Sequence, residues 1–95
     1  METGTFMVLS TAHIRCATGQ VLTSWAALGA YSQPLMVAPT PHGWFLATLR
    51  PPADVQQLLP EELPAILAFG RLHDCRYVLL DSDGPIEAEL PVFAW

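Results

Sequence analysis

Short continuous apolar runs and one longer run with helical spacing divide the first third of the chain. The run from Thr5 to Ser10 is continuously apolar and contains a β-branched residue, which is typical of a buried strand. A helical repeat follows at Val21, Leu22, Trp25 and Leu28. Gly29 ends this repeat, and Gly19 weakens its first turn. The pattern therefore predicts a strand followed by an amphipathic helix.

Prolines and a glycine mark the middle of the chain as a hairpin. Pro34 opens an apolar run over residues 35–38, residues 39–43 are rich in turn formers, and residues 44–49 resume a strand pattern. These segments predict two strands joined by a longer loop. Pro51-Pro52 then prevents the sheet from continuing and prevents a helix from starting there.

A second helix is predicted after Pro60, which suits the first helical position and precedes two glutamates at the positive end of the dipole. One side of this helix carries Leu63, Ile66, Leu67 and Gly70. Pro64 leaves two alternatives, a helix that begins there or a distorted first turn. Asp74 is expected where the helix ends, residues 76–80 form a strand, and residues 81–85 form a turn.

The order of these elements predicts the fold class. Strand, helix, strand, strand, helix, strand is the ferredoxin-like β-α-β-β-α-β arrangement, an α+β two-layer sandwich. We expect one domain over residues 1–95, with an antiparallel four-stranded sheet and two helices on one face. The apolar C-terminal tail adds an edge strand, caps the sheet or docks onto a neighbouring protomer. In this arrangement the first strand runs opposite to the last.

Composition narrows the function classes. The chain is 52% hydrophobic and only 14% charged, so it must bury its apolar residues well or cover them with a partner, and a homodimer is one such solution. It has no lysine, and nine acids against four arginines give a formal net charge of −5. The arginines are Arg15, Arg50, Arg71 and Arg76. Four scattered arginines cannot track phosphates, so direct nucleic-acid binding is not expected. An acidic chain instead suits a larger protein with a basic surface.

The termini and cysteines indicate the compartment. Two cysteines are too few for a secreted disulfide framework. The first residues carry no cationic segment, and no apolar stretch is long enough to span a membrane. We therefore expect a cytoplasmic protein that does not bind membranes and keeps its thiols reduced.

Histidines and cysteines are the candidates for metal or thiol chemistry. The ferredoxin-like fold would gather all of them at one end of the sheet, which makes His13, Cys16, His73 and Cys75 weak zinc candidates, with His42 nearby. Their H-x-x-C and H-x-C spacings are unlike common zinc motifs, and connecting segments carry polar residues anyway. A Cys–His nucleophile lacks an orienting third group, and a disulfide between the cysteines is disfavoured in the cytosol. No metal and no cofactor are therefore predicted, and a small zinc- or thiol-dependent protein that uses this His/Cys cluster remains the alternative function.

Each of the other candidate motifs lacks residues that its catalytic or metal-binding function requires. Asp81-x-Asp83-Gly84 resembles the start of a calcium loop, but its twelfth position is Val92 instead of glutamate, so these residues are interpreted as turn formers. Ser10 and Thr11 near His13 lack a nucleophile elbow or a phosphate-binding glycine loop. We predict no catalytic residue and a non-enzymatic protein.

The acidic stretch and the aromatic tail are the predicted contact surface for a protein partner. Trp25 and Trp44 are assigned to the core, whereas the tail aromatics suit the core and an interface equally. The predicted partner-binding residues are Asp81, Asp83, Glu87, Glu89, Phe93 and Trp95.

Several segments together resemble a known family. They are Phe6–Ile14 (FMVLSTAHI), Gly43–Phe45 (GWF), Cys75–Asp81 (CRYVLLD), Asp81–Pro85 (DSDGP) and Leu90–Trp95 (LPVFAW). They are similar to a family of short uncharacterised bacterial proteins carried on plasmids and integrative elements. That family often has glycine where this chain has Asp74. The resemblance implies no activity, but its setting suggests an inhibitor of a host defence complex, of the anti-CRISPR or anti-restriction type.

Overall fold

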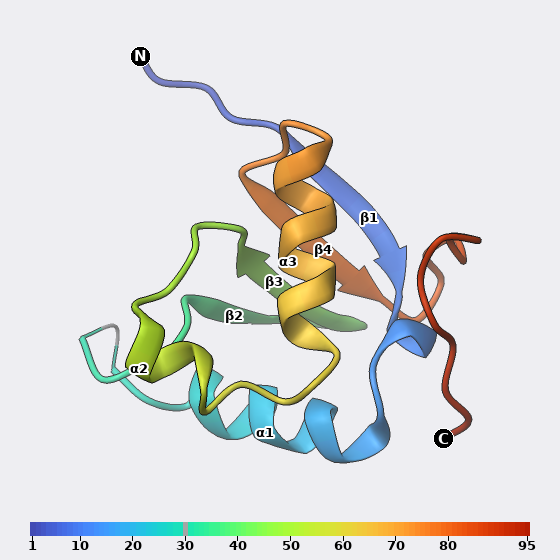
Figure 1. Cartoon of the computed structure of the whole chain (residues 1–95), viewed down its shortest axis with the longest axis horizontal. Helices are drawn as coiled ribbons and strands as arrows, with labels where there is room; N and C mark the ends of the chain where they lie inside the picture. The colour runs from blue at the N-terminus through green and yellow to red at the C-terminus, as the bar shows by residue number, and fades with distance from the viewer. Residues whose placement is uncertain (30) are drawn as a thin grey trace.

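The chain folds into a four-stranded sheet with helices packed beside it (Figure 1). The structure is a computed structural model and describes residues 1–29 and 31–95. Its elements in chain order are β1 (Phe6–Ser10), a 3-10 turn η1 (Thr11–His13), α1 (Cys16–Ala26), β2 (Val37–Thr40), β3 (Gly43–Ala47), α2 (Ala53–Gln56), α3 (Leu63–Leu72) and β4 (Tyr77–Asp81). The mixed α+β class and the four strands agree with the prediction from the sequence.

The sheet is mixed, which corrects the expected antiparallel order. Its strands lie in the order β1-β4-β3-β2, with β1 parallel to β4 and the other two pairs antiparallel. β4 takes an interior position, where Val78 and Leu80 are fully buried, whereas β1 lies at the edge with Phe6 and Val8 exposed. The predicted fold also placed the first strand beside the last, but in the opposite direction. A short apolar run does not specify the direction of its strand, so the sequence pattern did not reveal that β1 and β4 run parallel or that β4 pairs with β3.

Local boundaries differ from the predictions at three places where proline or glycine was decisive. Helix α3 begins at Leu63, so that Pro64 lies in the first turn, where its missing N–H is not needed. Helix α2 begins directly after Pro52, so the prediction that this proline prevents a helix was wrong for the same reason. Helix α1 begins at Cys16 and includes Gly19. A Cβ at that position would lie 2.9 Å from the Trp44 ring, so the close packing of the indole accounts for a glycine inside the helix.

The end of α3 adopts a left-handed cap. Asp74 has a φ of 58°, the only positive value at a non-glycine residue in the described part of the chain. The N–H of Cys75 donates to the Gly70 carbonyl at 2.9 Å, and the N–H of Asp74 donates to Arg71 at 3.0 Å. This pair of bonds is the Schellman motif, in which glycine is the usual residue at the position that Asp74 holds.

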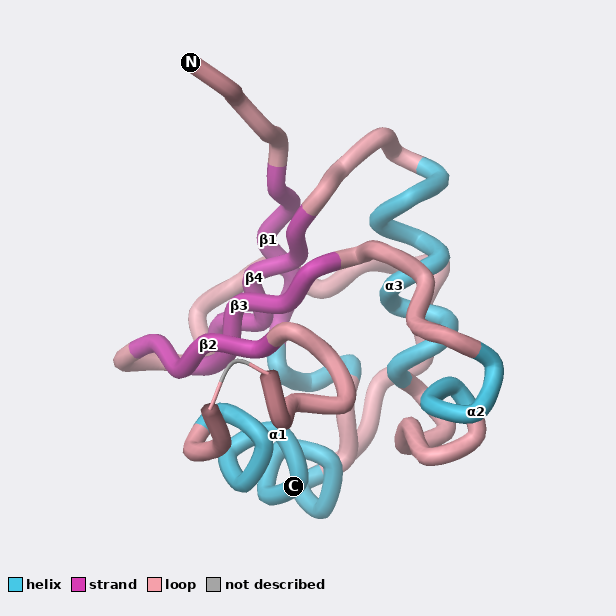
Figure 2. The backbone as a smooth tube through the Cα atoms, turned by 90° about the vertical axis from the view of Figure 1, so that its left-hand side faces the viewer, coloured by secondary structure: helices cyan, strands magenta, loops and turns pink. Residues whose placement is uncertain are grey.

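The core lies between one face of the sheet and the helices. Its side chains come from all the strands and from α1 and α3, and the most deeply buried are Ile14, Leu22, Leu46, Leu63, Ile66, Leu67, Val78 and Leu80. Trp25 and Trp44 pack against this core and are partly buried, close to the role expected for them. Figure 2 shows α3 on one side of the sheet and, among the described residues, no helix on the opposite side.

The C-terminal segment, residues 82–95, turns back beside the end of β1 and the start of α1 (Figure 1). The N–H of Ser10 donates to the Pro85 carbonyl at 2.8 Å, and the N–H of Phe93 donates to Ala12 at 2.8 Å. This segment forms no strand, so the expected edge strand is wrong, and its bonds are to the end of β1 and the residues that follow it in the same chain. None of the described helices is both long and apolar enough to cross a membrane.

Candidate functional site

The side of the sheet that faces away from α3 is apolar, and we call it the open face. Residues paired across strands share a face, and the register pairs Phe6 with Tyr77 and Phe45 with Leu79. The open face comprises Phe6, Val8, Ala38, Phe45, Ala47, Tyr77 and Leu79, all of them exposed or only partly buried. A solvated sheet face normally carries polar side chains, so this composition requires an explanation.

Three aromatic rings form the centre of the open face. The rings of Phe6 and Phe45 meet edge to face at 6.0 Å, and those of Phe45 and Tyr77 stack at 5.0 Å. Phe6 remains 54% exposed. The rings therefore continue across β1, β4 and β3 as one apolar surface, which is typical of a binding site in a soluble protein.

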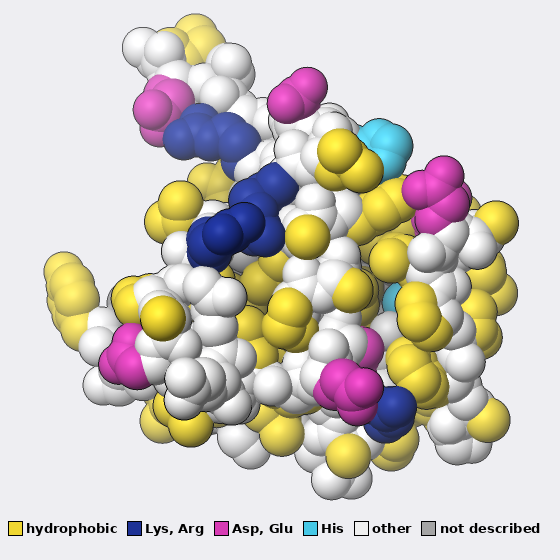
Figure 3. Space-filling view, in the orientation of Figure 1, with side chains coloured by type: hydrophobic (Ala, Val, Ile, Leu, Met, Phe, Trp, Pro, Cys, Tyr) yellow, Lys and Arg dark blue, Asp and Glu magenta, His cyan; other side chains and the backbone are white. Residues whose placement is uncertain are grey.

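Arginines border the open face where β4 begins. An open hollow of about 370 Å³ is lined by Met36, Ala47, Thr48, Leu49, Arg71, Arg76 and Tyr77, and we call it the arginine hollow. Arg50 lines the adjoining hollow. Figure 3 shows these cationic side chains gathered on one side of the molecule. Three of the four arginines are therefore less scattered than their sequence positions suggested, whereas Arg15 lies apart from them with Glu62.

Asp81 lies on the open face at the opposite end of β4, and three further acids follow it in the C-terminal segment; we call Asp81, Asp83, Glu87 and Glu89 the acidic end. The Oδ1 atom of Asp81 accepts the N–H of Asp83 at 2.8 Å, which fixes the turn that follows the strand. Asp83 and Glu89 are exposed, and Glu87 is half-buried. Among the residues that the structure describes, no cation forms an ion pair with any of these four acids.

A third region encloses His13, which is 1% exposed and lies beside the C-terminal segment. Its Nδ1 donates to the Pro91 carbonyl at 2.7 Å, and its Nε2 accepts the N–H of Glu87 at 2.9 Å. Both ring nitrogens are therefore bonded to backbone groups 78 and 74 residues away. The imidazole joins the two ends of the chain, a role that no local sequence signal indicated.

Glu62 anchors the neighbouring polar network. Its carboxylate accepts bonds from the Thr18 hydroxyl, the Arg15 N–H at 3.1 Å and the Arg15 guanidinium at 2.9 Å. Burial opposes ionisation, but the bonds from Thr18 and the Arg15 N–H, together with the Arg15 charge, outweigh it and lower the pKa of Glu62 below its ordinary value. The charged carboxylate is a structural acceptor here. The sequence pattern placed Glu62 at the positive end of the helix dipole but did not indicate its bonds to Thr18 and Arg15.

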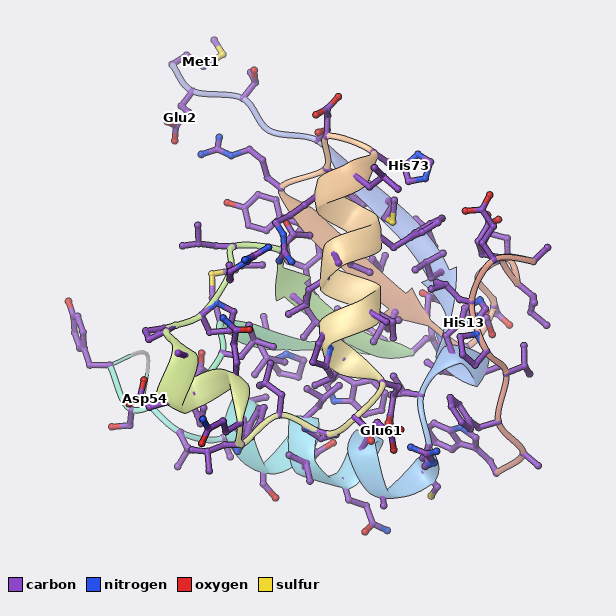
Figure 4. The ribbon with its side chains drawn as sticks, in the orientation of Figure 1. Met1, Glu2, His13, Asp54, Glu61 and His73 are labelled. Atoms are coloured by element: carbon purple, nitrogen blue, oxygen red, sulfur yellow. The ribbon has the colours of Figure 1, made fainter. Side chains whose placement is uncertain are left out.

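The metal candidates are divided between the two ends of the sheet. His13 and Cys16 follow the C-terminal end of β1, whereas His73 and Cys75 precede the N-terminal end of β4. Because β1 and β4 run parallel, these two ends are opposite ends of the sheet, separated by the length of a five-residue strand, roughly 16 Å. The Thr5 hydroxyl donates to Asp74 at 2.8 Å and thereby places the second pair at the start of β1. Figure 4 shows His73 and His13 far apart along the sheet. The predicted gathering is corrected, and in the described part of the chain no three His, Cys, Asp or Glu side chains converge on a metal position.

The tail aromatics contact the chain itself. Arg15 lies over the Phe93 ring, 4.4 Å from its centroid, in a cation–π arrangement. The indole N–H of Trp95 donates to the Ile14 carbonyl at 2.8 Å, although the residue stays 61% exposed. Of the predicted contact residues, Asp81 lies at the end of β4 and Asp83 in the turn after it, Glu87 and Glu89 lie in the C-terminal segment near His13, and Phe93 and Trp95 lie over η1 and α1.

Comparison with known proteins places the chain in a family. No curated protein and no solved structure matches it. Residues 6–95 match the C-terminal domain of a family of unknown function, DUF5983, which agrees with the resemblance to an uncharacterised family. Since this match covers nearly the whole sequence, the chain belongs to the DUF5983 family.

Proposed function

We propose that the chain is a protein-binding module without chemistry of its own, and that it covers a surface on a larger protein with its open face. The observation that carries this proposal is the continuous apolar sheet face with Phe6, Phe45 and Tyr77 at its centre. Exposed aromatic side chains are the residues most enriched at energetically important positions of protein interfaces.

The acidic end supports a partner with a basic surface. Asp81 ends the strand that crosses the open face, so the acids and the apolar centre can contact the same partner. Acids at the rim of an interface speed encounter with a basic partner and fix its orientation. The apolar centre then supplies most of the affinity.

The hydrogen bonds of the buried polar side chains support a protein without catalytic activity. Both nitrogens of His13 are engaged, and the Glu62 carboxylate already accepts three bonds, so neither is free to act as a base. Cys16 and Cys75 lie at opposite ends of the sheet.

A more specific version is that the partner is a host defence complex that targets nucleic acid, and that the chain comes from a mobile element. The resemblance of the opening and ending segments to plasmid-borne proteins motivates it. An acidic surface can occupy the basic site at which such a complex holds nucleic acid. A purified complex of this kind would keep its activity in the presence of the chain if this version is wrong.

The main experiment identifies the partner and then tests the surface. The full chain would be used to isolate a partner from its host, and the complex would be rebuilt from purified components. Phe6→Ser should weaken the rebuilt complex at least about tenfold in Kd, because a central aromatic contact typically contributes 2 kcal/mol or more. Asp81→Lys and Asp83→Lys should slow association and reduce its dependence on salt.

Leu58→Ser is the matched control, since Leu58 is similarly exposed but lies after α2, away from the open face. It should leave the affinity unchanged. Equal affinities for the wild type, Phe6→Ser and both charge reversals would remove the open face and the acidic end as the binding surface.

A homodimer is the second candidate, and the placement of the charges favours it. Arg76 precedes β4 and Asp81 ends it, so the open face has a cationic and an acidic border. Two copies packed face to face with antiparallel strands would bring opposite borders together. Sedimentation of the isolated chain decides between the candidates, because a monomer at high concentration contradicts the dimer and leaves the face free for another protein.

A further inference from the structure

We infer that the arginine hollow binds a nucleotide, with its phosphate on Arg71 and Arg76 and its base against Tyr77. The hollow lies at the edge of the open face, and its volume of about 370 Å³ exceeds the roughly 300 Å³ at which ligand clefts begin. The hollow shares Tyr77 and Ala47 with the open face, but its ligand and its arginines differ from those of the protein-binding proposal, so either proposal can fail without the other.

The two guanidinium groups retain unused donors. The Nη1 atom of Arg71 donates to the Thr48 carbonyl at 2.6 Å, and that of Arg76 donates to the Thr3 carbonyl at 3.3 Å. Each guanidinium has five N–H groups, so several remain on both side chains. In the described chain Arg71 has no ion pair, and Arg76 has one long contact, 4.0 Å to the exposed Glu2.

An anion with more than one charge suits this pair better than a carboxylate does. Two arginines on one hollow repel each other, and a ligand that both can bind removes the repulsion. A phosphate monoester carries about 1.5 to 2 negative charges and three acceptor oxygens, so two guanidiniums can share it. A carboxylate has one charge and two oxygens, which a single arginine satisfies.

The rest of the hollow suits a planar ring. Tyr77 forms one wall, and its own ring stacks on Phe45, which leads onto the open face. Met36, Ala47 and Leu49 supply apolar surface around it. Stacking of a base on an aromatic side chain contributes about 1–3 kcal/mol, and aromatic rings on an open four-stranded sheet are a known platform for it. A phosphate joined to a planar base therefore matches both halves of the hollow.

This chemistry has two sources, a free nucleotide and the end of a single strand of nucleic acid. Adenosine monophosphate, inorganic phosphate and a ten-residue oligodeoxyadenylate would be titrated into the full chain at low ionic strength and followed by NMR. We expect saturable binding of the nucleotide, weaker binding of phosphate, and shifts at Tyr77 and Arg76. Equal affinity of nucleotide and oligonucleotide per site supports the free nucleotide, and a much higher affinity of the oligonucleotide supports the strand end.

Substitutions of the arginines test which of them bind the nucleotide. Arg76→Gln should weaken nucleotide binding about 10- to 100-fold, the usual effect of losing bonds to a charged group. Arg71→Lys, which keeps the charge but loses the planar fork, should weaken it about tenfold. Arg50→Gln is the matched control with the same change of charge in the adjoining hollow, and it should alter the affinity less than about twofold. Thermal unfolding of each variant separates loss of binding from loss of folding.

Three results would overturn the inference. The first is no saturable binding of nucleotide or oligonucleotide at millimolar concentrations. The second is binding that Arg76→Gln and Arg50→Gln reduce equally, because the effect would then be one of net charge. The third is a phosphotyrosine peptide that binds in the hollow when nucleotide does not. Glu2→Gln should instead raise the affinity for the nucleotide slightly, because it removes the carboxylate that lies 4.0 Å from the Arg76 guanidinium.

Discussion

The region around His13 and the open face lie in the same small domain, yet they satisfy their side chains in opposite ways. Around His13 the C-terminal segment closes over the fold, and the buried imidazole and carboxylate have bonds to every polar atom that they present. On the open face three aromatic rings contact one another and solvent. The first region is complete within the chain, whereas the second lacks a cover.

This difference predicts which substitutions affect the stability of the chain and which affect its binding. Buried polar groups that are fully paired stabilise one structure and resist substitution. An apolar surface without a cover adds little to the stability of the isolated chain, and the proposed binding of a partner accounts for its composition. We therefore expect substitutions near His13 to reduce stability and substitutions on the open face to reduce binding.

His13→Ala should have the largest effect on stability. It removes a fully buried ring and leaves the Glu87 N–H and the Pro91 carbonyl without their partners. We expect a loss of about 3 kcal/mol in the free energy of unfolding, measured with urea. Hydrogen exchange should increase throughout residues 85–95. His42→Ala, at an exposed hairpin position, is the control, and a similar loss there would contradict the role assigned to His13.

Glu62→Gln should cost about 1–3 kcal/mol at neutral pH, because it removes the charge that pairs with Arg15 and accepts the Thr18 hydroxyl. The pKa of Glu62 is lowered in the folded state, so its contribution is complete above the ordinary carboxyl pKa and is lost as the pH falls through the folded value. The stability difference between wild type and variant should therefore be constant above about pH 5 and shrink below it.

Glu61→Gln is the comparison for that measurement, since Glu61 is exposed and lies 3.7 Å from the same guanidinium. It should change stability by less than about 0.5 kcal/mol at any pH. A pH-independent difference for Glu62→Gln would mean that the carboxylate is not the charged acceptor described above.

The secondary structure was largely predictable from the sequence because its signals are local. The apolar runs located the strands, and the spacing of Leu63, Ile66 and Leu67 located α3. The ferredoxin-like prediction placed the first and last strands side by side but in opposite directions. The parallel direction of β1 and β4 and the pairing of β4 with β3 were not predictable, since they join segments far apart in the sequence and depend on which strand is more completely buried. The same error misplaced the histidines and cysteines, because a strand that runs the other way exchanges the ends of the sheet.

The candidate sites were predictable only where they follow one segment. The acids from Asp81 to Glu89 are close in sequence, so the sequence presents them as one group, and their role as a contact surface stays a prediction. The open face combines alternate residues of all four strands, and its lack of a cover follows from the positions of the helices. The arginine hollow joins the end of α3 to the start of β4, and His13 meets residues at the far end of the chain, so neither leaves a local pattern.

Asp74→Gly tests the boundary next to the arginine hollow and should stabilise the chain. Asp74 adopts a φ of 58°, a region that costs most residues about 1–2 kcal/mol and costs glycine nothing. Part of this gain is offset by the greater freedom of glycine in the unfolded chain, so we expect about 0.5–1 kcal/mol. Asp74→Ala should destabilise instead, and if both substitutions had the same sign, the left-handed cap would not explain the effect.

Phe6→Ser should have the smallest effect on stability, about 0.5 kcal/mol, because the ring is half exposed and has edge contact with Phe45 alone among the aromatic side chains of the open face. Phe93→Ser is the matched substitution in the closed region, where the ring lies under Arg15, and it should cost about 1–2 kcal/mol. Urea unfolding of the two variants compares the regions directly. If Phe6→Ser unfolds the chain as readily as Phe93→Ser does, the open face belongs to the core. If it leaves the fold intact, any binding that it abolishes can be attributed to the face itself, because the protein that fails to bind is still folded.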